Sequence, residues 1–117
     1  EFRRVLFRSK KVIFSGLTVL ELARIIDLII IPFKDLKGIF HVSGKSISKY
    51  DLLKIIANVY KKSIEIVPNE LINIDRSLNS SCFNNITGYQ IREWPDLIES
   101  MYDFYLLNQW IFQVKNF

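Results

Sequence analysis

"GIFHVSGKSISKYDLLKIIANVYKKSIEIVP" (Gly38–Pro68) is the stretch that decides the fold class. Ile39–Ser43 is a short apolar run that predicts a buried strand, and Ser63–Pro68 alternates in the manner of another strand. Between them, Ser48 is a typical helix N-cap, and apolar residues then recur at helical spacing as far as Tyr60. The predicted inward residues of this helix are Leu52, Leu53, Ile56, Val59 and Tyr60. Short strands that alternate with helices predict an α/β fold.

The preceding residues extend the same alternation. Val12–Phe14 predicts a short strand, and Thr18 with Glu21 forms a capping box for a helix over Val19–Ile31 that Pro32 ends. On a helical wheel, Glu21, Arg24 and Asp27 lie on the side expected to face water. The opposite face is apolar and is expected to pack inward, and consists of Val19, Leu22, Ala23, Ile25, Ile26, Ile29 and Ile30.

The following residues predict two more helical segments. Asn79 or Ser80 is expected to cap one short turn that ends before Gly88, and Pro95 opens a last helix that runs to about Leu106. The inward stripe of that helix is Leu97, Ile98, Met101 and Tyr105. We therefore expect three short strands and about three helices, too little sheet for a free-standing protein of this class. Residues 106–117 lose helical periodicity and form a tail of uncertain structure.

The N-terminus bears on the meaning of the net charge. The chain has 16 Lys and Arg against 12 Asp and Glu, a formal charge of +4. However, "EFRRVLFRS" (Glu1–Ser9) resembles a translated sequencing-library adapter, so we expect residues 1–10 to be a non-native leader. Without the charges of Glu1, Arg3, Arg4 and Arg8 the chain has 13 basic and 11 acidic residues, a charge of +2. A nucleic-acid partner is then not expected.

Other classes of site find little support. The single cysteine, Cys82, excludes an internal disulfide, and with His41 as the one histidine no metal site is expected. His41 is expected to be a hydrogen-bonded core residue of a strand. The longest apolar run, Leu17–Phe33, contains three charged residues, so no membrane span is expected and the protein is assigned to the cytoplasm.

Tyr50 and Lys54 have the Tyr-x-x-x-Lys spacing of a reductase catalytic pair. On the wheel, however, Lys54 lies about 160° from the inward arc. In addition, the chain's four glycines form no phosphate-binding turn for a dinucleotide. We interpret the pair as incidental and expect no catalytic residue in this chain.

Four stretches in order nonetheless resemble one family: "FSGLTVLELARIID", "LKGIFHVSGKSISKYDLLKIIANVY", "IEIVP" and "IDRSLNSSCFNNITGYQIREWPDLIESMYDFY". Together they are similar, over residues 11–105, to the C-terminal, substrate-binding part of extended short-chain dehydrogenases/reductases, in particular dTDP-4-dehydrorhamnose reductase-like proteins. The resemblance implies a parent enzyme that reduces a 4-keto nucleotide sugar with NAD(P)H. It also implies that the N-terminal Rossmann domain, with the cofactor turn and the true Tyr/Lys pair, is absent here, so that this fragment binds no cofactor.

The resemblance also implies substrate-binding residues: Arg76, Asn79 and Ser80 toward the nucleotide part, and Thr18 in a turn ahead of a helix. An arginine fork suits a diphosphate, and Asn and Ser suit sugar or phosphate oxygens. Family members more often have Pro where this chain has Ser77, which leaves the loop less rigid. The residues alone favour more ordinary roles: Arg76 pairs with Asp75 or another surface carboxylate, and Asn79 and Thr18 are helix caps.

Two further hypotheses stay open. An epimerase or dehydratase of the same superfamily would share this C-terminal architecture. Alternatively, the chain is a small non-enzymatic α/β module that binds a protein partner through exposed apolar helix faces such as Leu20, Leu28 and Ile31.

Overall fold

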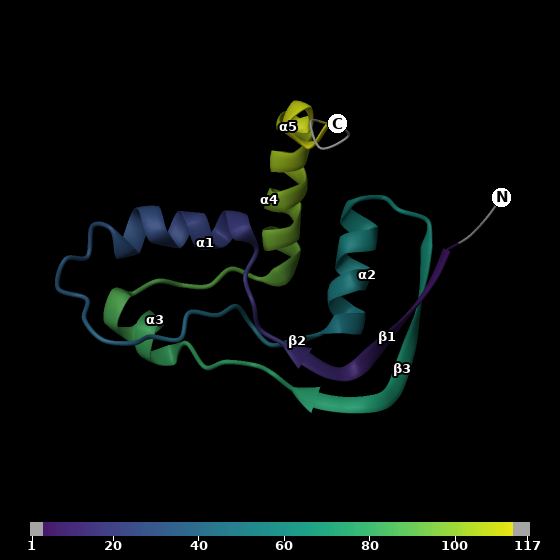
Figure 1. The fold of residues 1–117 in the computed structure, drawn as a ribbon, viewed down its shortest axis with the longest axis horizontal. Coiled ribbons are helices and arrows are strands. Elements are labelled where there is room, and N and C mark those ends of the chain that lie inside the picture. Colours follow the sequence, from purple (N-terminus) through teal and green to yellow (C-terminus); the bar gives the residue numbers. More distant parts are fainter. Residues whose placement is uncertain (1–3, 114–117) are drawn as a thin grey trace.

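Short strands and helices alternate along the computed structural model, which describes residues 4–113 (Figure 1). The order is β1 (Arg4–Phe14), α1 (Val19–Ile25), the π-helical η1 (Ile26–Ile30), β2 (Ile47–Ser48), α2 (Lys49–Val59), β3 (Ile64–Asp75), α3 (Ser81–Thr87), α4 (Trp94–Leu107) and α5 (Gln109–Gln113). The prediction of an α/β fold is confirmed.

The three strands form one sheet in the order β2-β1-β3. β1 and β3 run parallel, with Arg4 opposite Ile64 and Ile13 opposite Asp75, and the register shifts between Ser9 and Lys11. β2 pairs with the end of β1 in the antiparallel sense. Both long strands extend beyond the predicted ones, and β1 runs back through most of residues 1–10. That these residues are a leader stays a prediction, and residues 1–3 lie outside the described part.

Helices α2 and α4 pack together over this sheet, and the core lies between them (Figure 1). Its centre is Trp94, Leu97 and Ile98 of α4. Around them pack Phe14, Ile47, Leu52, Ile55, Ile56, Val59, Tyr60 and Met101. The wheel of α2 therefore predicted its buried face well, since four of its five expected residues belong to this cluster. Tyr105 of α4 is more exposed than predicted and stacks near Tyr60, with ring centroids 6.2 Å apart.

Two local predictions are wrong. Residues 39–46 are irregular, and the second strand along the chain is instead Ile47–Ser48, which pairs with the end of β1. His41 consequently lies exposed in a loop rather than in a core strand. The loop follows a different path because Gly44 is held at β1, where its N–H donates to the Ser15 carbonyl at 2.7 Å.

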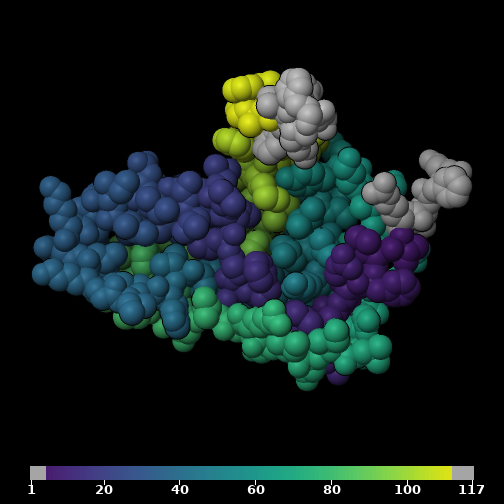
Figure 2. Space-filling view, viewed as in Figure 1, coloured from purple at the N-terminus to yellow at the C-terminus, as the bar shows by residue number. Residues whose placement is uncertain are grey.

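Helix α1 and segment η1 project away from the sheet as an arm, with α3 and the 31–46 loop beside them (Figures 1 and 2). The helix predicted over Val19–Ile31 is confirmed in position, but its two sides are only partly as predicted. Val19 is 84% exposed, whereas Glu21, expected to face water, is completely buried. Ile25 is completely buried, as predicted. Glu21 is buried beside it because Tyr89 and Arg92, in the segment before α4, donate to its carboxylate, and a wheel based on hydropathy alone does not detect such partners.

The structure describes residues 106–113 of the predicted tail. α4 continues through Leu107 and the short α5 covers Gln109–Gln113, so helical structure extends further than the sequence indicated. Residues 114–117 lie outside the described residues. Within residues 4–113, the structure has no helix of the length and hydropathy that a bilayer crossing needs.

Candidate functional site

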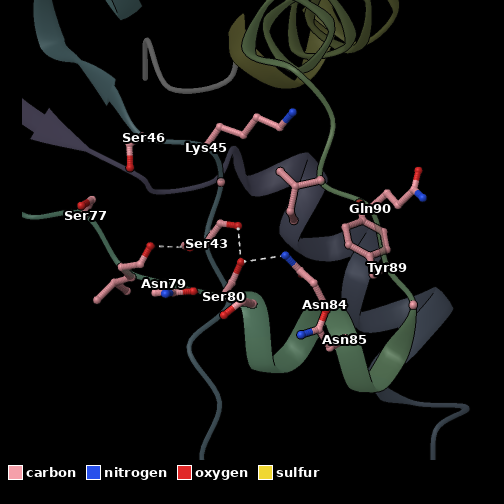
Figure 3. Close-up of a pocket in the computed structure, with 15 residues that line it drawn as sticks. Ser43, Lys45, Ser46, Ser77, Asn79, Ser80, Asn84, Asn85, Tyr89 and Gln90 are labelled. Carbon is pink, nitrogen blue, oxygen red and sulfur yellow. Dashed lines mark hydrogen bonds between the residues drawn. The ribbon is translucent and has the colours of Figure 1, made fainter.

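A cavity of about 1080 Å³ opens between the β1 end of the sheet and α3 (Figure 3). Three segments that are distant in sequence line it: residues 43–46 before β2, residues 77–81 with 84 and 85 from the end of β3 into α3, and residues 88–91 before α4. Most of the lining side chains carry hydroxyl or amide groups. They include Ser43, Ser46, Ser77, Asn79, Ser80, Ser81, Asn84, Asn85, Tyr89 and Gln90.

Ser15 holds two of these segments at the end of β1. Its hydroxyl accepts from the N–H of Leu78 at 2.7 Å, and its carbonyl accepts from the N–H of Gly44. Ser15 is only 2% exposed, so both bonds lie away from solvent. Sequence reasoning gave Ser15 no role beyond closing a strand, because its two partners lie 29 and 63 residues away.

A row of hydrogen bonds forms the floor of the cavity (Figure 3). The Ser43 hydroxyl donates to the Leu78 carbonyl at 3.2 Å, and the Ser80 hydroxyl donates to the Ser43 carbonyl at 3.4 Å. The Asn84 amide N–H donates to the Ser80 hydroxyl at 3.1 Å, whereas Asn84 Oδ1 is buried without a protein partner. A buried amide oxygen in a polar cavity is usually satisfied by water or a ligand.

Of the four residues predicted to bind substrate, two line the cavity and two do not. Asn79 and Ser80 line the cavity, while Arg76 immediately precedes the lining residue Ser77 and is exposed. Asn79 Oδ1 also accepts from the Ser81 N–H at 2.9 Å, just before α3, whose N-cap residue is Ser80. Thr18 lies outside the lining, where its hydroxyl accepts from the Glu21 N–H at 3.1 Å and caps α1.

The loop at Ser77 is held by side-chain hydrogen bonds instead of by proline. Asp75 Oδ1 accepts from the Ser77 N–H at 2.9 Å and from its hydroxyl at 2.6 Å. Both bonds lower the pKa of the Asp75 carboxyl below its usual value, and the bond from the hydroxyl has the larger effect. Asp75 therefore binds Ser77 rather than Arg76, whose guanidinium forms no ion pair within residues 4–113.

The cavity has few groups suited to acid–base or nucleophilic chemistry. No His, Cys, Asp or Glu belongs to its described lining. Lys45 lines it, but its ammonium pairs with Glu93. Cys82 is exposed on α3 outside the lining. Among the described residues, no three metal-binding side chains are grouped. The arrangement is typical of recognition of a polar ligand.

Tyr50 and Lys54 do not form a proton-transfer pair. Lys54 is exposed, and its ammonium lies over the face of the Tyr50 ring, 5.3 Å from the centroid. Lys10 approaches the same ring at 5.1 Å. These are cation–π contacts at the surface, so the wheel's placement of Lys54 on the solvated side is confirmed.

The turn at Gly16 does not have the form of a dinucleotide-binding turn. Gly16 follows β1 and precedes α1, the place where a Rossmann turn would approach a pyrophosphate. Here the Phe14 ring already occupies the space where a Cβ would lie, and the Gly16 carbonyl faces Gly44. The turn is therefore packed against protein and leaves no cradle for phosphate.

Comparison with known proteins identifies the architecture. No protein-family profile and no curated protein sequence matches the chain. The structure is similar to dTDP-glucose 4,6-dehydratase from Bacillus anthracis strain Ames, solved in complex with NAD, with a TM-score of 0.62 at 15% sequence identity. The match covers 92% of this chain and 36% of the dehydratase, so the chain spans about a third of that protein's length. At this identity the likeness establishes the fold.

Proposed function

We propose that this chain is the substrate-binding region of an NAD(P)-dependent enzyme that acts on a nucleotide-linked sugar, and that the cavity holds the nucleotide sugar. The observation that carries the proposal is the cavity itself: a space of nucleotide-sugar size with walls of neutral hydroxyl and amide groups. Pockets for such ligands are commonly about 300–1,000 Å³ and position a small number of polar groups around the ligand.

The charge distribution agrees with a phosphate-bearing ligand. Arg76, next to the lining residue Ser77, has a guanidinium that no described carboxylate occupies. A guanidinium binds phosphate oxygens in a bidentate manner, and it stays charged at any working pH. Asn79 and Ser80 would then contact neighbouring oxygens, as the family resemblance implies.

The chemistry would be supplied elsewhere. The described lining holds no His, Cys, Asp or Glu, and the family resemblance implies that the cofactor site and the catalytic Tyr/Lys pair belong to a Rossmann domain outside this chain. Exposed apolar side chains support such a partner, with Val19 at 84%, Ile31 at 66% and Leu71 at 91% exposure. In the full protein, we expect reduction of a 4-keto sugar, which consumes one NAD(P)H per turnover.

The same exposed apolar side chains also suit the second candidate, a non-enzymatic module that binds another protein. A polar cavity of this size is not required for that function. Binding of a nucleotide sugar therefore separates the two candidates.

The test is titration of the 117-residue chain with dTDP-glucose and, separately, with thymidine, followed by NMR. We expect saturable dTDP-glucose binding, weakened about tenfold by Arg76→Ala, which is equivalent to about 1.4 kcal/mol for one charged phosphate contact. Thymidine, which has no phosphate, should bind with the same affinity to the unchanged chain and to Arg76→Ala. Arg24→Ala, a matched deletion of an exposed arginine on α1, should change neither affinity.

Absence of saturable binding at about 10 mM dTDP-glucose, a free energy of about −3 kcal/mol, would contradict the proposal. Reduction is tested in the full-length protein by nicotinamide oxidation with a 4-keto nucleotide sugar. A dehydratase or epimerase returns its hydride to the product and would show no net oxidation.

A further inference from the structure

Glu21 is the most deeply buried charged side chain among the described residues, with no exposed surface. Its carboxylate accepts from two residues of the segment that joins α3 to α4. The Tyr89 hydroxyl donates to Oε1, and Arg92 donates to Oε2 through Nε at 3.1 Å and Nη2 at 2.5 Å. We call Glu21, Tyr89 and Arg92 the Glu21 cluster.

The cluster connects three parts of the molecule. Glu21 belongs to α1, Tyr89 and Arg92 belong to the connecting segment, and Arg92 Nη1 also donates to the Ser100 hydroxyl of α4 at 3.1 Å. Tyr89 is at the same time a lining residue of the cavity, together with Gln90 and Ile91 (Figure 3). The Glu21 carboxylate, which lies outside the cavity, thus accepts a hydrogen bond from Tyr89, whose side chain forms part of the cavity wall.

We propose that Glu21 is the positioning residue of this cavity: its carboxylate fixes the wall of residues 89–91 against α1 and so sets the shape in which the nucleotide sugar is bound. The proposal deepens the proposed function and rests on it. Glu21 itself does not line the cavity, so its effect on the ligand would be transmitted through Tyr89.

The physical reason is the cost of an unpaired buried charge. A carboxylate without solvent is tolerated when donors satisfy its oxygens, and removing its partners costs several kcal/mol. If residues 89–91 moved away from α1, Glu21 would lose the Tyr89 hydroxyl and strain its bonds to Arg92. The wall is therefore restricted to the position in which all three donors reach the carboxylate. Burial raises the pKa of Tyr89 to about 12, with its bond to Glu21 contributing, which keeps the hydroxyl a donor.

The test compares Glu21→Gln with Asp27→Asn, which removes one exposed negative charge from the adjoining η1. Glutamine keeps the size of the side chain, but its NH₂ group cannot accept from Tyr89 or Arg92. We expect Glu21→Gln to weaken dTDP-glucose binding at least tenfold and to speed hydrogen exchange in residues 88–92. Exchange in α2 should stay unchanged. Asp27→Asn should match the wild type in both measurements.

Tyr89→Phe is the second variant, since it removes one hydrogen bond and leaves the Glu21–Arg92 pair. It keeps the test valid if Glu21→Gln fails to fold. Tyr89→Phe should also weaken dTDP-glucose binding and speed hydrogen exchange in residues 88–92, but by less than Glu21→Gln. Unchanged exchange in residues 88–92 would overturn the proposal, as would faster exchange with unaltered affinity. If the wild-type chain binds no dTDP-glucose, the proposed function fails, and exchange alone then decides whether Glu21 sets the wall.

Discussion

Replacing Gly44 by Ala should destabilise the protein, because the added Cβ clashes with the backbone of another segment. Gly44 lies where the 43–46 segment crosses the turn after β1, and a Cβ there would be 2.6 Å from the Gly16 carbonyl oxygen. Overpacking of this kind costs about 1–3 kcal/mol, and the reduced freedom of the unfolded chain returns about 0.4–1 kcal/mol. Because the atom met is a backbone oxygen that cannot easily move, the clash should cost the upper value of about 3 kcal/mol, and the net loss should be about 2 kcal/mol. For 117 residues the unfolding entropy is about 0.25 kcal/mol/K, so Tm should fall by about 8 °C.

Gly88→Ala is the matched control, measured by calorimetry or circular dichroism. Gly88 has a φ of 73° but no atom within 4 Å of an added Cβ, so Ala there meets conformational strain without a clash. That strain costs about 1 kcal/mol, or about 4 °C in Tm. Equal losses in the two variants would show that the close approach at Gly44 is not required, and would refute the reasoning.

Three further predictions concern the core, the buried carboxylate and the Ser77 loop. Trp94→Phe removes the indole N–H that donates to the Lys45 carbonyl at 2.7 Å, and urea denaturation should show a loss of about 2 kcal/mol. Burial by itself raises the pKa of Glu21, but its hydrogen bonds outweigh burial and bring the pKa below 4.5. Its contribution to the unfolding free energy is therefore complete above pH 4.5 and lost as the pH falls through the lower folded pKa. Glu21→Gln should flatten the unfolding free energy in that acid range, and an unaltered pH profile would contradict this. Ser77→Ala should let the pKa of Asp75 rise toward 3.8, as followed by carboxyl ¹³C chemical shifts.

The elements with internal signals could be predicted from the sequence. Helix α2 has a capping serine, with the Asp51 N–H donating to Ser48 Oγ at 3.1 Å, and an apolar face that meets the core. In α3 and α4 the Gly88 C-cap and the proline in the first turn lie close to the expected positions. Capping and periodicity depend on residues within a few positions of one another, so the linear sequence contains the information.

The site could be predicted only in part. Asn79 and Ser80 were predicted by resemblance to bind substrate; both line the cavity, and their role stays a prediction. Ser15 and Gly44 were missed because their contacts join segments about 30 to 60 residues apart. Nothing local in the sequence distinguishes Ser15, which holds two cavity segments, from an ordinary serine at the end of a strand.

Glu21 shows why the helical wheel was insufficient for α1. The wheel separates polar from apolar sides and assigns the apolar side to the core of the same chain. In this chain that assignment holds only in part: Ile25 is buried as predicted, but Val19 is exposed and Glu21 is buried with its carboxylate bound to Arg92. A helix that leaves apolar residues exposed and buries a charge against its own chain is expected when part of its packing surface belongs to another domain. The exposed apolar residues of α1 thus agree with the proposal that another domain covers part of this helix.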